Sequence, residues 1–149
     1  MNEIFLGSEI TQPEEKEAFF HVIPVPYERS VSYGGGTNKG PQGIIDASQQ
    51  LETTDGISEP CKSGIYTHAA LDCQGEAEAV LARIRTLNAQ IAGRGQLPIV
   101  LGGEHTVSYG AVMGVADVYA DEPLGIIQFD AHADLRDSYE AVRGVMLVL

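Results

Sequence analysis

Apolar positions recur along the chain with two different periods, and the period distinguishes predicted helices from predicted strands. From Glu76 to about Gly93 the apolar side chains return every three or four residues, as they do in an amphipathic helix. Residues 41–51 show the same period over a shorter stretch that begins with Pro41, a residue suited to the first turn of a helix. The pattern therefore predicts helices at 41–51 and 76–93.

Continuous apolar runs predict strands instead. The runs at 97–101 and 125–129 are typical of parallel strands buried on both faces, and a third run at 19–25 leads into a loop. A short strand is also predicted at 64–68. Residues 106–118 lie between two of these runs and can form the helix of a right-handed crossover, so an α/β fold with a parallel sheet is predicted.

A polar segment at 32–40 separates the first predicted strand from the first predicted helix. It contains four glycines, so its backbone can reach conformations that are closed to other residues. Such loops can hold phosphate. The spacing is not that of a nucleotide-binding loop, however, and no Gly-Lys-Ser or Gly-Lys-Thr follows.

Length and composition suit one globular domain, with 149 residues of which 44% are hydrophobic and 20% charged. A formal net charge of −12 argues against a nucleic acid or an anionic membrane as the partner, because both require a basic face. The same acidity suits a cationic substrate. An acidic surface that serves solubility alone is the simpler alternative.

The cysteines and the N-terminus indicate a cytoplasmic protein. Cys61 and Cys73 are too few for a disulfide scaffold and match no zinc spacing, so two reduced thiols are expected. The first twenty residues are acidic, unlike a signal peptide. No apolar run reaches the roughly 18 residues of a membrane-spanning helix.

Metal-binding residue types follow two of the predicted strands. Gly-Gly-Glu-His at 102–105 follows one, and Asp130, His132 and Asp134 follow the other at alternate positions, so they can project together. Ligands of open α/β sheets bind beyond the carboxyl ends of the strands. Two carboxylates and an imidazole suit manganese, iron or zinc, and carboxylate-rich sets favour manganese. Each residue alone could be a turn, cap or loop residue, but their grouping favours a metal site.

These motifs resemble those of the ureohydrolases, the family of arginase, agmatinase, guanidinobutyrase and formiminoglutamase. The resemblance covers nearly the whole chain up to Glu140. It is carried by the segments 25–27, 32–44, 102–106 and 130–137. The residues from 135 to Glu140 are more similar to agmatinases than to arginases.

The resemblance implies an arginase-like, three-layer α/β fold and a centre with two manganese ions. His105, Asp130 and Asp134 would bind one ion, and Asp130 and His132 the other, so that Asp130 would bridge them. A hydroxide between the ions would attack the guanidinium carbon of a substrate and release urea and an amine. The family sheet has the strand order 2-1-3-8-7-4-5-6, in which the third and fourth strands are not neighbours.

The family pattern also includes residues that this sequence does not contain. Family members are about twice as long, and their second half supplies a Ser-x-Asp-x-Asp-x-x-Asp-Pro motif with two further metal ligands, a proton-transfer histidine and a substrate-binding glutamate. The chain is therefore expected to be the truncated, N-terminal part of one ureohydrolase domain at 1–149, with a non-family tail at 141–149. A truncated gene, a frame change near residue 140 or an error in the gene boundaries would each give this pattern.

No catalytic residue is thus expected beyond the metal ligands, with Glu104 and Thr106 as residues that support them. An isolated chain is expected to be poorly stable, because the strands that separate the third from the fourth would be missing.

The function implied by the resemblance is manganese-dependent hydrolysis of a small cationic guanidino compound, with agmatine cleaved to putrescine and urea. Guanidinobutyrase or formiminoglutamase activity is the alternative within the family, whose members are usually homo-oligomers. A different class of function stays open, because the ligands in the chain are too few to hold two ions. In that case the chain would be an inactive remnant or an interaction module.

Overall fold

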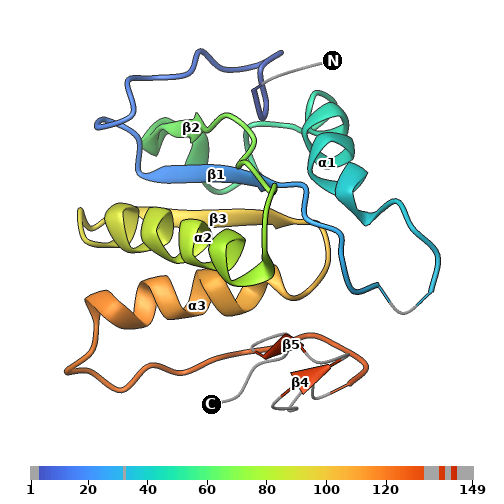
Figure 1. Ribbon diagram of the computed structural model, residues 1–149. Helices are drawn as coiled ribbons and strands as arrows, with labels where there is room; N and C mark the ends of the chain where they lie inside the picture. The colour runs from blue at the N-terminus through green and yellow to red at the C-terminus, as the bar shows by residue number, and fades with distance from the viewer. Residues whose placement is uncertain (1–3, 32, 133–137, 140–141, 144–149) are drawn as a thin grey trace.

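A three-stranded parallel sheet with helices on both faces forms the centre of the molecule (Figure 1). The computed structural model describes residues 4–31, 33–132, 138–139 and 142–143. The central strands are β1 (Phe20–Val25), β2 (Ile65–Thr67) and β3 (Leu97–Gly102). The α-helices are α1 (Gly40–Ser48), α2 (Ala77–Ala92) and α3 (Val107–Val118), and 3-10 helices lie at η1 (Thr37–Lys39) and η2 (Pro60–Ser63). A separate antiparallel pair, β4 (Ser138–Tyr139) and β5 (Val142–Arg143), lies near the C-terminus.

The strand order is β2-β1-β3, which confirms the first three positions of the expected family order. All six residues of β1 pair in parallel with β3, from Phe20 opposite Leu97 to Val25 opposite Gly102. Three of them also pair with β2. The predicted helices and the first three predicted strands are thereby confirmed, with boundaries shifted by a few residues at most. Among the described residues, no helix is both long and apolar enough to cross a membrane.

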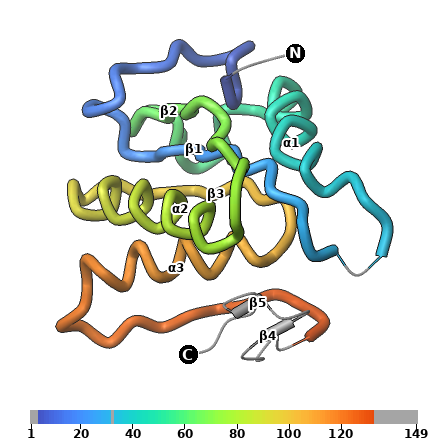
Figure 2. The backbone as a smooth tube through the Cα atoms, viewed as in Figure 1, coloured from blue at the N-terminus to red at the C-terminus, as the bar shows by residue number. Residues whose placement is uncertain are grey.

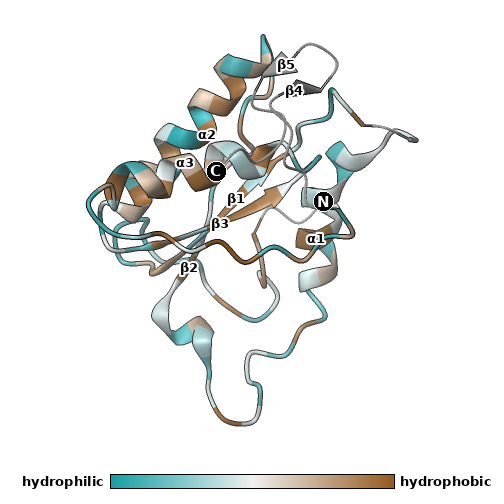
Figure 3. Cartoon of the chain, turned by 90° about the horizontal axis from the view of Figure 1, so that it is seen from below, coloured by the Kyte–Doolittle hydropathy of each residue, from teal (hydrophilic) through white to brown (hydrophobic). Residues whose placement is uncertain are grey.

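Helices α2 and α3 cover one face of the sheet and α1 lies on the other (Figure 3). The core on the α2 side contains Ile23 and Val25 of β1 together with Val80, Ile84 and Ile91 of α2, all of them fully buried. These α2 residues are the apolar positions that recur every three or four residues, so the helical period supplies the buried face directly.

The N-terminal segment extends the layer that contains α1. Leu6 of this segment packs with Val22 and Ile65 in a second apolar cluster. Its backbone N–H donates to the hydroxyl of buried Ser48 at 2.9 Å, and that hydroxyl donates to the carbonyl of Ile45 at 2.7 Å. The residues before β1 are therefore tied to the end of α1.

The predicted strand at 125–129 is wrong. The chain returns past α3 in an extended form there, without strand pairing (Figure 2). Ile127 and Phe129 are 85% and 98% exposed. An extended segment becomes a strand only where a neighbour takes up its N–H and C=O groups, and the described residues place none beside it.

The prediction that the strand at 97–101 is buried on both faces is also wrong. Leu97 is 44% exposed and Ile99 is 36% exposed, because β3 is an edge strand of the central sheet. The exposed apolar surface agrees with the low stability expected of an isolated chain, which stays a prediction. Most of the tail at 141–149 lies outside the described residues.

Two glycines of α3 allow the helix to approach α2 closely. A Cβ atom on Gly114 would lie 2.4 Å from the carbonyl oxygen of Arg85 and 2.8 Å from the Cβ atom of Asn88. A Cβ atom on Gly110 would lie 2.9 Å from both the carbonyl oxygen of Leu81 and the Cβ atom of Ile84. Both positions are buried, so a side chain there can be accommodated only if the helices move apart.

We predict that Gly114→Ala lowers the free energy of unfolding by about 1–3 kcal/mol, because the added methyl group overlaps the α2 backbone. Gly43→Ala in α1 is the matched control. Nothing lies within 4 Å of a Cβ atom at that position, and alanine there favours the helix by roughly 0.5–1 kcal/mol. Denaturant unfolding followed by circular dichroism measures both, and a Gly114→Ala protein as stable as the Gly43→Ala protein would contradict the proposed close approach.

Candidate functional site

After β3 the backbone continues alongside the end of β1. The N–H of Gly103 donates to Val25 at 3.1 Å and that of Glu104 to Tyr27 at 2.9 Å, which extends the strand pairing into the loop. A Cβ atom on Gly103 would lie 2.0 Å from the carbonyl oxygen of Tyr27. The second glycine of the Gly-Gly-Glu-His motif is thus required by the contact between these two backbones.

Glu104 joins the loops that follow β1 and β3. Its side chain is buried, and its carboxylate accepts hydrogen bonds from the backbone N–H groups of Arg29 at 2.8 Å and Ser30 at 2.7 Å. The Ser30 hydroxyl donates to the other carboxylate oxygen at 2.6 Å. Burial alone would raise the pKa of Glu104, but these hydrogen bonds outweigh it and hold the pKa below its ordinary value. The Glu104 carboxylate therefore fixes the loop beside His105 through these hydrogen bonds.

Glu28 shapes the glycine-rich segment, a role that the sequence analysis missed. One of its carboxylate oxygens accepts hydrogen bonds from the Thr37 hydroxyl at 2.7 Å and from the N–H groups of Gly36 at 2.6 Å and Asn38 at 3.1 Å. These bonds, with that of Thr37 as the largest contribution, lower the pKa of Glu28. No local pattern points to these bonds, because the partners lie 8 to 10 residues after Glu28 along the chain.

His105 and Asp130 are the first members of the two predicted groups of ligands. His105 lies in the loop between β3 and α3, at an open cavity of about 510 Å³ that is also lined by Val100 and Val112. Asp130 accepts a hydrogen bond from the N–H of His132 at 2.9 Å, which is the largest cause of its lowered pKa. The charges of His132 and His105 lower that pKa further. No strand precedes Asp130, so the structure does not place it at a strand end as the sequence predicts.

The described residues do not by themselves form a metal centre. The imidazole and carboxylate donors suit manganese chemically. Within the described part of the chain, however, no three His, Cys, Asp or Glu side chains gather closely enough to hold one ion. The His132 ring lies 3.8 Å from the Asp130 carboxylate and is largely exposed. Asp134, the fourth predicted ligand, lies outside the described residues.

The parallel sheet with helices on both faces defines an α/β protein. Glu104 and His105 lie at the carboxyl edge of this sheet, where proteins of this class usually bind their ligands. A sequence model of the Arginase family matches residues 18–146, so the chain belongs to that family.

Individual relatives agree with this assignment. The chain is 35% identical over 128 residues to an N(1)-aminopropylagmatine ureohydrolase of Synechocystis, a match that covers 80% of this chain and 41% of the relative. It is 32% identical over 133 residues to an agmatinase of Bacillus anthracis, covering 87% of this chain and 45% of the relative. The chain thus spans less than half the length of these curated relatives.

A solved structure shows the same fold. The crystal structure of agmatine ureohydrolase of Thermoplasma volcanium superimposes with a TM-score of 0.80 at 24% identity. The superposition covers 95% of this chain and 46% of that one. This likeness confirms the arginase-like α/β architecture of the described residues.

We predict that Glu104→Gln lowers the free energy of unfolding by about 1–3 kcal/mol, because the amide nitrogen cannot accept the hydrogen bonds that one of the two carboxylate oxygens now takes. Hydrogen exchange should also show lost protection at Arg29 and Ser30. Glu76→Gln is the control, since Glu76 forms only an exposed ion pair with Arg29 at 3.0 Å and should change stability by less than about 1 kcal/mol. Equal effects of the two substitutions would show that Glu104 does not hold the loops together.

Proposed function

We propose that this chain supplies part of the active site of an agmatinase-type ureohydrolase, an enzyme that hydrolyses a guanidino compound to urea and an amine. The observation that supports the proposal is the match of residues 18–146 to the Arginase family, in a chain whose fold places His105 in the loop directly after β3, at the carboxyl edge of the parallel sheet. In this proposal His105, Asp130, His132 and Asp134 are manganese ligands. Glu104 holds the loop that carries His105.

Agmatine is the proposed substrate. Relatives of the chain are named agmatinase and N(1)-aminopropylagmatine ureohydrolase, and both names denote the hydrolysis of a compound with a guanidinium group. The net charge of −12 favours the approach of such a cation. N(1)-aminopropylagmatine is the second substrate to test, because it carries the same guanidinium on a longer polyamine.

An inactive remnant or interaction module is the second candidate function. The observation that favours it is the exposure of Ile127 and Phe129, together with an edge of β3 that pairs with no other strand of the described residues. Exposed apolar groups next to a free strand edge are typical of a surface that binds another polypeptide.

We predict that the 149-residue chain alone releases no urea from agmatine, even with manganese in excess. The described residues gather too few ligands for an ion, and each absent ligand lowers metal affinity. Urea release is measured colorimetrically, with His132→Ala as the control. Manganese-dependent turnover clearly above that control would contradict the prediction.

A chimaera tests the proposed function itself. This chain is fused to the part of the Bacillus anthracis agmatinase that the match does not cover, and urea release is measured with agmatine and with N(1)-aminopropylagmatine. We expect manganese-dependent hydrolysis that His105→Ala and His132→Ala each reduce by at least about a hundredfold. A chimaera that folds cooperatively but hydrolyses neither compound would favour the interaction module instead.

A further inference from the structure

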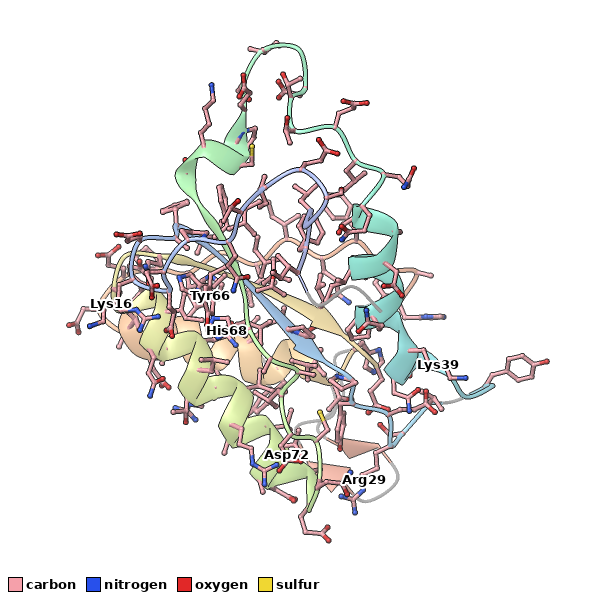
Figure 4. The ribbon with its side chains drawn as sticks, turned by 90° about the horizontal axis from the view of Figure 1, so that it is seen from above. Lys16, Arg29, Lys39, Tyr66, His68 and Asp72 are labelled. Carbon is pink, nitrogen blue, oxygen red and sulfur yellow. The ribbon has the colours of Figure 1, made fainter. Side chains whose placement is uncertain are left out.

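Two histidines face each other across β1 and β2, in a part of the sheet that the candidate site does not use. His21 in β1 is fully buried, and its Nδ1 atom lies 2.9 Å from Nε2 of His68, the residue that follows β2. The ring centroids are 5.2 Å apart. Tyr66 packs edge-on against His68 at 4.9 Å, and Figure 4 shows these two side chains next to each other.

The hydrogen-bond partners of His21 fix where the hydrogens lie. Its Nε2 atom is 3.3 Å from the carbonyl oxygen of Ala18, and a carbonyl only accepts, so Nε2 must carry a hydrogen. In the neutral ring Nδ1 is then an acceptor, and Nε2 of His68 donates to it. The pair can take up one additional proton and still share a hydrogen bond. With two additional protons, two N–H groups would oppose each other across 2.9 Å without an acceptor.

The surroundings of the pair do not compensate a second positive charge. Burial is the largest cause that lowers the pKa of each ring, and the charge of His21 further lowers that of His68. The charged side chains that act on the rings are Glu15 from the N-terminal segment and Arg94 from the turn after α2. They form an ion pair with each other at 3.0 Å and act in opposite directions. Among the described residues, no carboxylate bonds directly to either ring.

We propose that His21 and His68 form a proton-sensitive latch, which holds β2 against β1 while at least one ring is neutral and releases β2 when both rings are protonated. Strand β2 is suited to release because it is only three residues long and lies at the edge of the sheet. Thr67 of β2 also holds the N-terminal segment, since its hydroxyl accepts from Phe5 at 3.0 Å and its N–H donates to Gln12 at 2.7 Å. Opening of the latch therefore loosens this segment as well.

The direction of the pH effect follows from the burial of the pair. Because the folded state lowers the pKa of both rings below the ordinary histidine value of 6.5, the released state binds more protons. The latch is therefore fully closed above that value and opens as the pH falls below it. Each extra proton raises the opening constant by up to about tenfold per pH unit. The pH range in which the latch opens lies above the pH range in which ordinary carboxylates titrate.

Hydrogen exchange of the β2 amides tests the latch. Protection of Thr67 and His68 is compared at about pH 7.5 and about pH 5.5, after correction for the intrinsic exchange rate. We expect a loss of protection of about tenfold at the lower pH if the released state binds one extra proton, and up to about a hundredfold if it binds two. His68→Gln should remove most of this loss, because the glutamine amide donates to His21 without titrating. A protein with His105→Gln and His132→Gln together is the matched control and should keep the loss, since neither residue belongs to the pair.

Two results would overturn the proposal: β2 protection that does not depend on pH in the unmodified chain, or the same loss in His68→Gln. If His68→Gln does not fold, the ring resonances of the unmodified chain are titrated by nuclear magnetic resonance. The latch requires that β2 protection falls as the second of the two rings gains its proton. Titration of both rings with unchanged β2 protection would show that the pair is only a packing contact.

Discussion

The buried carboxylate of Glu104 is the contact on which the candidate site depends. Strand pairing aligns β1 with β3 only as far as Gly103 and Glu104, and beyond that point the two loops are free to diverge. A buried carboxylate without donors would cost several kcal/mol, so the loop at Arg29 and Ser30 must remain where it can donate. This requirement fixes the backbone on both sides of the site. The position of His105 follows, because it is the next residue after Glu104.

The Glu104 contact also affects the glycine-rich segment indirectly, through Glu28. Glu28 directly precedes the loop that Glu104 holds, and its own carboxylate gathers the N–H groups at the start of η1. Two acidic side chains thus organise the carboxyl edge of the sheet through backbone donors. The net charge of −12 therefore overstates the charge available for a cationic ligand, since part of it is already satisfied by hydrogen bonds inside the protein.

Local patterns predicted the helices and β1 well, because an amphipathic helix or a buried strand next to it is specified by its own residues. Helix α2 begins and ends within about one residue of its predicted bounds for this reason. The segment at 125–129 has an equally apolar sequence, but its conformation depends on a neighbouring strand that the sequence pattern does not reveal. The role of Glu28 was missed on similar grounds, because bonds from a side chain to distant backbone leave no periodic signal. Candidate metal ligands could be named from their motif, whereas the described residues do not bring three of them together.

Within the described residues, neither the edge of β3 that faces away from β1 nor the segment at 125–129 has a strand partner. In a parallel pair, alternate residues direct their N–H and C=O groups to the same neighbour, and Leu97 and Gly103 donate to β1. The backbone N–H and C=O groups of the alternate residues therefore face away from β1. These residues are Pro98, Val100 and Gly102, and the proline has no N–H to donate. Val100 and Gly102 also line the cavity at His105, so a strand added at this edge would close the cavity and the sheet together. Burial of the exposed apolar side chains would contribute about 25 cal/mol per Å². A strand at this edge would therefore change the surroundings of His105 as well as extend the sheet.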